Sequence, residues 1–335
     1  MNIVKIINTA VFLIIQFNIC IAETIPSDSS IVKILPQEKK DFIFTKHQIS
    51  ERRNEKSVLL TSVKSVITDA VEYKDTLWVG TSEGLYKYSL RNETLEQCKL
   101  ISSNLNITKI KKDAAGVLWV ASINDGLWRI KDSEAQKVLD VSPVYALEIS
   151  KDTTVWAGTN VGLYKLKNLS NAWQRYAEEG YSGYEIPDNI VENLFCDAHN
   201  NTWVIMPDEF AFIRSNTAEE HVPGFRNISA QDFELKYITE IFPDQYLFVT
   251  SKGIFLMPNS PHEHGHDGHE IKSGPEQKMY LLTNKQLLLT ETLDTKQIHT
   301  ATVDRKGNLL LSNDTEIYCI KRKTMKRVVN NLSKS

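Results

Sequence analysis

The chain has 335 residues, of which 41% are hydrophobic and 24% charged, so it can bury one large core or two small ones. Its 39 basic and 42 acidic residues nearly cancel, which excludes the strongly basic surface of a nucleic-acid-binding protein. Once the leader is removed, three well-separated cysteines remain (Cys98, Cys196 and Cys319), and they predict no disulfide framework.

Residues 1–22 have the features of a secretory signal peptide. Lys5 gives a weak positive start, residues 10–15 are apolar, and Ala22 offers a small residue for cleavage before Glu23. This apolar run is shorter than the ~20 residues that a membrane-spanning helix needs, and no later run is long enough. We therefore expect a secreted or periplasmic protein with no stable membrane span; an uncleaved anchor is the alternative.

A repeated pattern begins at about residue 63, after a mixed lead-in over residues 23–62. Three clear copies lie at residues 77–88, 118–130 and 155–166. Each copy has a short apolar run with a tryptophan, a glycine where the chain reverses, and a run in which apolar and polar residues alternate. Such short runs favour strands, and glycine tolerates the positive φ of tight turns. Each copy therefore predicts a β-hairpin.

Each unit of ~40 residues adds a strand before and a variable strand after this hairpin, and four antiparallel strands predict a propeller blade. Weaker copies follow around Trp203, Phe248 and Leu310. We predict an all-β chain with a single β-propeller over residues 63–330, in which six blades are visible and seven are expected. A strand near Phe42 is expected to help close the ring, because an open sheet edge invites aggregation.

The tryptophans recur at one strand position of successive units. A residue repeated in this way is expected to pack between blades and not to bind a ligand. The residues concerned are Trp78, Trp119, Trp156 and Trp203.

The run Trp-Val-Gly-Thr-x-x-Gly-Leu-Tyr-Lys-Tyr at residues 78–88, with its copies, resembles the propeller repeats in the sensor regions of hybrid two-component regulators. The resemblance is good over residues 63–167 and weakens beyond them, where Trp203 lacks the Gly-Leu-Tyr part. It implies a β-propeller, and in that family such propellers can sense glycans outside the cell. Because no membrane span, kinase or receiver domain follows the repeats, we expect a standalone propeller whose signalling role is not inherited.

An aromatic and acidic stretch between the third and fourth visible units is the first candidate site. It comprises Trp173, Tyr176, Tyr181, Tyr184 and Glu185. Aromatic rings and carboxylates on a loop suit sugar stacking and hydrogen bonds to hydroxyl groups, so we expect a glycan or protein ligand here. The alternative is that residues 173–176 form an ordinary fourth strand that packs on its neighbour, followed by an ordinary loop.

A His-rich insertion over residues 258–276 is the second candidate site. Its imidazoles, at His262, His264, His266 and His269, can supply nitrogen ligands to zinc or copper. The alternative is a solvated insertion between blades that binds metal only adventitiously. The expected fold itself requires no cofactor.

Three hypotheses follow for function. The leading one is an exported, monomeric, non-catalytic propeller that binds an extracellular glycan or protein through loops on one face. The second is an envelope metal-handling protein that uses residues 262–270. The third is a propeller lyase or hydrolase with a channel site: the sequence has none of the common hydrolase or phosphate-loop motifs, but channel residues from different blades leave no local motif. His299 is the histidine to examine there.

The basic run at residues 321–327 is expected to lie in a solvated strand pair of the last blade, with an interaction tail as the alternative.

Overall fold

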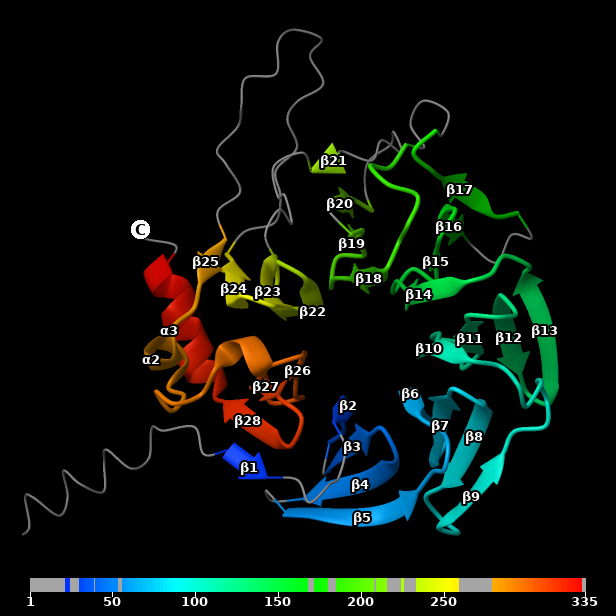
Figure 1. The fold of residues 1–335 in the computed structure, drawn as a ribbon, viewed down its shortest axis with the longest axis horizontal. Coiled ribbons are helices and arrows are strands. Elements are labelled where there is room, and N and C mark those ends of the chain that lie inside the picture. The colour runs from blue at the N-terminus through cyan, green and yellow to red at the C-terminus, as the bar shows by residue number, and fades with distance from the viewer. Residues whose placement is uncertain are drawn as a thin grey trace, which may run out of the picture.

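The computed structural model describes residues 22–24, 30–38, 40–53, 56–167, 172–179, 185–207, 209–215, 224–225, 233–258 and 279–332. These residues form seven four-stranded antiparallel sheets that surround a common centre, as Figure 1 shows. The fold is a seven-bladed β-propeller, so the predicted fold class and the expected number of blades are confirmed.

Three blades cover the first half of the ring, each with its first strand innermost (Figure 1). The first comprises β2 (Ile31–Pro36), β3 (Asp41–Thr45), β4 (Gln48–Arg53) and β5 (Lys56–Ser62). The second comprises β6 (Ile67–Tyr73), β7 (Thr76–Thr81), β8 (Gly84–Ser89) and β9 (Thr94–Gln97). The third comprises β10 (Ile107–Lys112), β11 (Leu118–Ser122), β12 (Leu127–Lys131) and β13 (Glu134–Leu139).

Three further blades repeat this order. The fourth comprises β14 (Val144–Ile149), β15 (Val155–Thr159), β16 (Gly162–Leu166) and β17 (Gln174–Tyr176). The fifth comprises β18 (Asn193–Cys196), β19 (Thr202–Ile205), β20 (Phe210–Ile213) and β21 (Gly224–Phe225). The sixth comprises β22 (Leu235–Phe242), β23 (Gln245–Thr250), β24 (Gly253–Met257) and β25 (Tyr280–Leu281).

The seventh blade takes its strands from both ends of the chain, and this closes the ring. It consists of β26 (Thr300–Val303), β27 (Leu309–Ser312), β28 (Glu316–Ile320) and, outermost, β1 (Ala22–Thr24). Glu23 lies opposite Ile317 in the antiparallel pair of β1 with β28. The prediction that the strand near Phe42 closes the ring is wrong, because Phe42 lies in β3 of a complete blade that occupies most of the expected lead-in.

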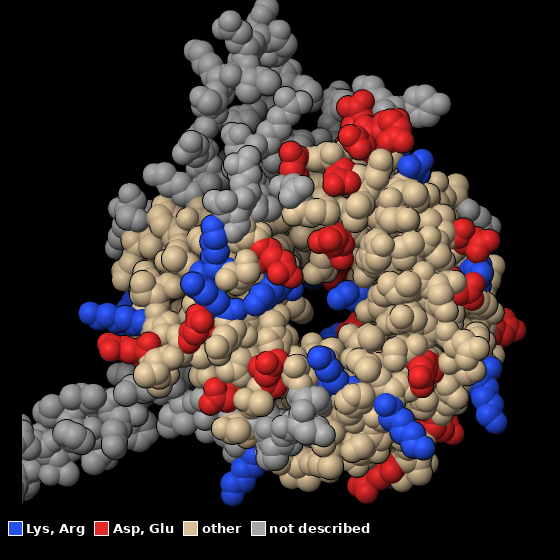
Figure 2. All heavy atoms as spheres, viewed as in Figure 1, with Lys and Arg blue, Asp and Glu red and all other residues tan. Residues whose placement is uncertain are grey.

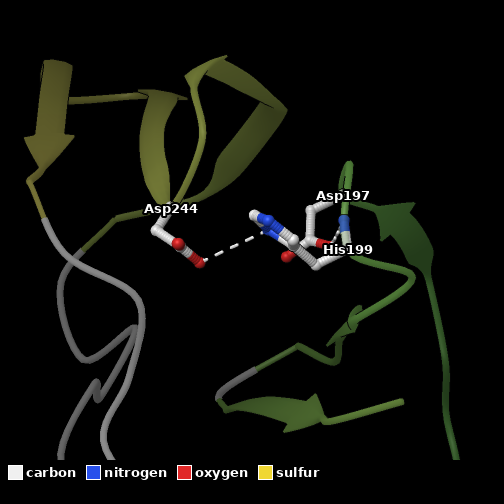
Figure 3. Close-up of side chains that lie close together, drawn as sticks. All are labelled: Asp197, His199 and Asp244. Carbon is white, nitrogen blue, oxygen red and sulfur yellow. Dashed lines mark hydrogen bonds and ion pairs between the residues drawn. The ribbon is translucent and has the colours of Figure 1, made fainter. Parts of the chain in front are cut away.

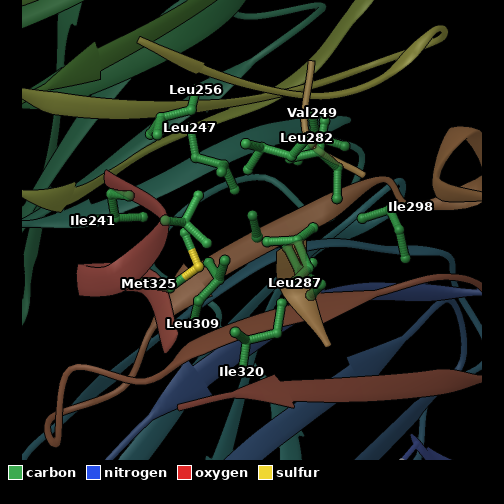
Figure 4. Close-up of a cluster of buried hydrophobic side chains, with 14 of the residues drawn as sticks. Ile241, Leu247, Val249, Leu256, Leu282, Leu287, Ile298, Leu309, Ile320 and Met325 are labelled. Carbon is green, nitrogen blue, oxygen red and sulfur yellow. The ribbon is translucent and has the colours of Figure 1, made fainter. Parts of the chain in front are cut away.

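Apolar clusters hold adjacent blades together. The seven clusters formed by the described residues each span one of the seven interfaces. The largest lies between the sixth and seventh blades, where α2 (Asn284–Leu287) and α3 (Arg322–Leu332) also pack (Figure 4). The smallest lies between the seventh and first blades and contains Ile31, Ile34, Ile43, Leu310 and Ile317.

The basic run near the C-terminus is helical, so the predicted strand pair is wrong there. Met325, Val328 and Val329 are buried in α3, and this helical spacing turns one apolar face onto the outer side of the sixth and seventh blades. Lys323 and Lys326 are exposed on the same helix. A short 3-10 turn, η1 (Thr295–Gln297), precedes the seventh blade.

The repeated tryptophans are packing residues, as predicted. Trp119 and Trp203 have no exposed surface, Trp156 is 4% exposed, and Trp78 is half-buried. Each belongs to the cluster between its own blade and the next one in sequence. The indole N–H of Trp119 also donates a hydrogen bond of 3.1 Å to Asp113 in the turn before β11.

A basic side chain on the neighbouring strand lies over the tryptophan in three blades. Lys87 lies 4.8 Å from the ring centroid of Trp78, and Lys165 lies 5.1 Å from that of Trp156. Arg129 lies over Trp119 in the same way, at 6.0 Å. In each blade the two residues are direct cross-strand partners, so the register that forms the hairpin also places a cation on the indole.

The sixth blade is shifted by one residue from the sequence prediction. Leu247 faces the seventh blade, whereas Phe248 packs on Trp203 of the fifth blade, with ring centroids 5.4 Å apart. Because side chains alternate across a strand, Phe248 lies on the opposite side of its sheet from the tryptophans of the other blades.

Removal of β1 is expected to destabilise the protein. A variant of the mature chain that begins at Ser30 leaves β28 as an open edge, so its melting temperature should fall and its tendency to aggregate should rise. Thermal unfolding followed by circular dichroism, with light scattering, measures both. A variant that lacks residues 333–335 is the matched control, and equal melting temperatures for the two truncations would contradict closure by β1.

Replacement of Trp119 with alanine should lower the free energy of unfolding by about 3–5 kcal/mol, because it removes a fully buried indole from the interface between the third and fourth blades. Leu281→Ala, at a residue that is 54% exposed, should change it by less than about 0.5 kcal/mol. Urea unfolding of both variants tests this. Similar losses for the two would show that the indole does not hold the blades together.

Candidate functional site

The structure places the predicted ligand residues in two environments. Tyr176 ends β17 with no exposed surface and packs on Trp156, with ring centroids 6.1 Å apart. Trp173 is half-buried, and its indole N–H donates a 2.8 Å hydrogen bond to the Val138 carbonyl of the third blade. Residues 174–176 thus form the packed fourth strand of the alternative prediction, and Tyr176 has no exposed surface.

The remaining predicted residues lie beyond β17. Glu185 is exposed. The others lie outside the described residues: Tyr181, Tyr184, His262, His264, His266 and His269.

The ends of the loop that carries Glu185 are anchored to the fourth and fifth blades. Ile186 is buried between these blades, and its amide donates to the Ala177 carbonyl at 3.2 Å. The Asn189 side chain accepts from the Glu178 amide and donates to the Glu179 carboxylate, both at 3.0 Å. The hydrogen bond from Asn189 lowers the pKa of Glu179. The loop thus presents exposed carboxylates on a fixed base.

Gly162 allows this base to approach the hairpin of the fourth blade. Its φ is +121°, and a Cβ atom there would lie 2.2 Å from the Tyr176 carbonyl oxygen. Its amide donates to the Asn189 carbonyl at 2.8 Å. A larger residue at this position would push the loop away from the blade.

The two segments singled out in the sequence begin at opposite ends of the ring. Strands alternate in direction within a blade, so the connections between blades and the turns between second and third strands share one end. Residues 177–192 connect two blades at that end. The segment between Met257 and Tyr280 joins the third and fourth strands of the sixth blade, at the other end.

All seven innermost strands line a cavity of about 90 Å³ at the centre of the ring. Figure 2 shows this hollow with basic side chains at its rim. The ionisable and amide side chains of its wall are Lys33, Asp69, Lys109, Lys111, Glu148, Asn193 and Tyr237. The sequence analysis missed this group because no inner strand contributes more than two of its members.

Two ion pairs cross the wall between neighbouring blades. Lys33 bonds Asp69 and Lys111 bonds Glu148, each at 2.5 Å. Burial alone would raise the pKa of Asp69, but Lys33, Lys109 and Lys111 outweigh it and lower that pKa. Burial likewise works against the charge of Lys111, yet Glu148 and Asp69 raise its pKa.

Lys109 differs from these four residues. It makes no hydrogen bond or ion pair with another described residue of the wall. Burial lowers the pKa of Lys109, and although Asp69 opposes this, the positive charges of Lys111 and Lys33 add to the fall. The wall therefore carries one cation that its carboxylates leave unpaired.

A second group of titratable side chains lies in the turns of the fifth and sixth blades. Asp197, His199 and Asp244 bring potential ligand atoms within 4.8 Å of one another (Figure 3). Asp197 is buried, whereas His199 is exposed and its Nδ1 lies 3.8 Å from Asp244. A histidine and two carboxylates have the chemistry of a divalent metal site.

The hydrogen bonds of Asp197 argue against that use. Its two oxygens accept from the amides of His199 and Asn201, from the Asn201 side chain and from the Tyr246 hydroxyl, at 2.7–2.9 Å. A carboxylate has about four acceptor sites, so these bonds saturate it. Asp304 holds the corresponding turn of the seventh blade in the same way, through Asn308. Asp197 is therefore a turn-forming residue.

His299 is likewise structural. Its two ring nitrogens lie 3.2 Å from the carbonyl oxygens of Gln297 and Ile31, so it links η1 and the first blade. It is not among the residues that line the channel.

The ring resembles several solved β-propellers. One is the extracellular domain assigned to the one-component system BT4673 of B. thetaiotaomicron, with a TM-score of 0.68 and 13% identity over 90% of this chain. This chain spans only 40% of that domain. Two further similar structures each have a TM-score of 0.65. One is virginiamycin B lyase from Staphylococcus aureus, with 11% identity over 90% of this chain and 98% of the lyase. The other is YCF48 from Cyanidioschyzon merolae, with 8% identity over 91% of this chain and 99% of YCF48.

At these identities the likeness shows the fold alone; the similar structures include extracellular domains assigned to one-component and hybrid two-component systems. No protein-family model and no curated protein sequence matches the chain. Among the described residues, no helix is long and apolar enough to cross a bilayer. The class of protein is thus a seven-bladed β-propeller.

Tyr246→Phe should lower the free energy of unfolding by about 1.5–3 kcal/mol, because it removes a hydrogen bond to a buried carboxylate. Tyr280→Phe at the rim of the same blade, where no hydrogen bond to the hydroxyl is formed within the described chain, should be nearly neutral. Denaturant unfolding provides the comparison. A zinc-induced rise in melting temperature that His199→Ala abolishes would instead show that the group binds metal.

Proposed function

We propose that this protein is an exported, non-catalytic propeller module that binds an extracellular glycan or protein through the loop of residues 178–190. The single observation that carries the proposal is the anchored base of this loop. Ile186 and Asn189 hold both of its ends, while Glu178 and Glu185 remain exposed. Exposed polar groups on a rigid scaffold are typical of binding loops in folds of this kind.

The residues between these carboxylates favour a carbohydrate. Tyr181 and Tyr184 lie in sequence between Glu179 and Glu185, and tyrosine rings can stack on the apolar faces of sugars. Carboxylates in the same loop can accept hydrogen bonds from sugar hydroxyl groups. The extracellular sensor domains among the structural relatives agree with a location outside the cytoplasm, and so does the predicted signal peptide over residues 1–22.

The double variant Tyr181→Ala/Tyr184→Ala should weaken glycan binding by about tenfold or more, equivalent to about 1.4 kcal/mol. A glycan array identifies the ligand of the wild-type protein, and calorimetry with that glycan gives the loss. Tyr280→Ala, on the other end of the ring, is the matched control and should bind as the wild type does. A wild-type protein that binds no glycan or protein ligand, or a double variant with unchanged affinity, would refute the proposal.

A further inference from the structure

We propose that the central channel contains a second site, separate from the loop of residues 178–190, which binds a small monocarboxylate at Lys109. The proposal concerns a different ligand and a different part of the ring from the proposed function, and it does not depend on that function.

The balance of charge in the wall is the first support. Lys33 and Lys111 are each paired with a carboxylate, at 2.5 Å. Asp69 also accepts the amides of Ala70 and Ile110, at 2.9 and 2.8 Å, so three of its acceptor sites are occupied. Three lysines therefore face two carboxylates, and the excess of one positive charge resides at Lys109. A monoanion neutralises this charge, whereas a dianion would reverse its sign.

Uncharged donors on the same wall are the second support. Tyr237 lines the cavity, and its hydroxyl forms no hydrogen bond with another described residue. Asn193 uses its side-chain oxygen to accept its neighbour's amide, at 3.0 Å, which leaves its NH₂ group as a donor. A lysine, a phenol and an amide offer hydrogens, and a carboxylate accepts several at once.

The size of the cavity limits the ligand. A space of about 90 Å³ can hold a few water molecules or a small organic acid. Its wall is built from inner strands of all seven blades, so the donors are held by the closed ring and need little rearrangement on binding. An oligosaccharide bound by the outer loop is therefore a different ligand.

The electrostatics of Lys109 agree with this geometry. Burial lowers its pKa, and a bound anion would favour the charged form again. The ionisable groups that face it are Lys33 on β2, Asp69 on β6, Lys111 on β10, Glu148 on β14 and Tyr237 on β22. As the pH rises above neutrality, Lys109 should lose its proton before Lys111 does, and affinity for the anion should fall.

The test is calorimetry of the wild-type protein with sodium acetate, sodium glucuronate and sodium chloride at constant ionic strength. We expect acetate to bind and to bind more weakly at pH 9.5 than at pH 7. Lys109→Met should weaken acetate binding at least tenfold, and Lys109→Arg should retain most of it. Lys112→Met is the matched control, because Lys112 is exposed on the same strand and does not line the cavity.

Several results would overturn the proposal. Equal binding of chloride would show an adventitious ion only, and binding of glucuronate without acetate would assign the channel to a sugar ligand. Lack of acetate binding by the wild type, or unchanged binding by Lys109→Met, would remove the site. If Lys109→Met does not fold, the test is the acetate affinity of the wild type and of Lys109→Arg. An affinity of the wild type that is the same at pH 7 and pH 9.5, or loss of binding by a folded Lys109→Arg, would then overturn the proposal. The glycan-binding result for the Tyr181→Ala/Tyr184→Ala variant concerns the other site and does not change how the acetate results are interpreted.

Discussion

Apolar contact between neighbouring sheets is the interaction on which this structure depends. Every described cluster of buried residues is shared by two blades, so no blade has a complete core of its own and the ring has to close. The interface at the closure, around Ile31 and Leu310, is the smallest of the seven. Backbone hydrogen bonds supplement it, since β1 pairs with β28 and the Ile31 amide donates to the Asp314 carbonyl at 3.1 Å. Backbone hydrogen bonds thus join the two ends of the chain where the ring closes.

The sequence predicted the second, third and fourth blades most clearly, because a tryptophan and a turn glycine coincide in each of them, and it showed the fifth, sixth and seventh only as weaker copies. The first blade was missed because Phe42 occupies the tryptophan position and the turn between β3 and β4 has no glycine. β1 was missed because three residues are too few to show a period. The helix at the C-terminus was not predicted because only three apolar residues, Met325, Val328 and Val329, mark its buried face within a run of basic and polar residues. The local hairpin pattern therefore predicted the propeller architecture, whereas the pairing of β1 with β28, which are far apart in sequence, could not be predicted.

The candidate sites show the same division. Aromatic composition alone could not separate Tyr176, which ends a packed strand, from the residues that follow it in the loop. The boundary between strand and loop is set by contacts between residues distant in sequence. Gly162 lies against the Tyr176 carbonyl, and its amide donates to the Asn189 carbonyl. The channel residues were beyond prediction for a different reason: Lys33, Asp69 and Lys109 are each about 36 to 40 residues apart, roughly one blade, so only ring closure brings them together.

The channel also connects charge to the packing of the ring. Asp69 of the second blade accepts the Ile110 amide of the third, next to the irregular register of β10 between Ile107 and Lys109. The same carboxylate pairs with Lys33 of the first blade and lies in the field of Lys109. A change of charge at Lys109 therefore acts on a group that joins three consecutive blades. A monocarboxylate bound at Lys109, as we propose, would therefore change the electrostatic environment of a carboxylate that contacts all three blades.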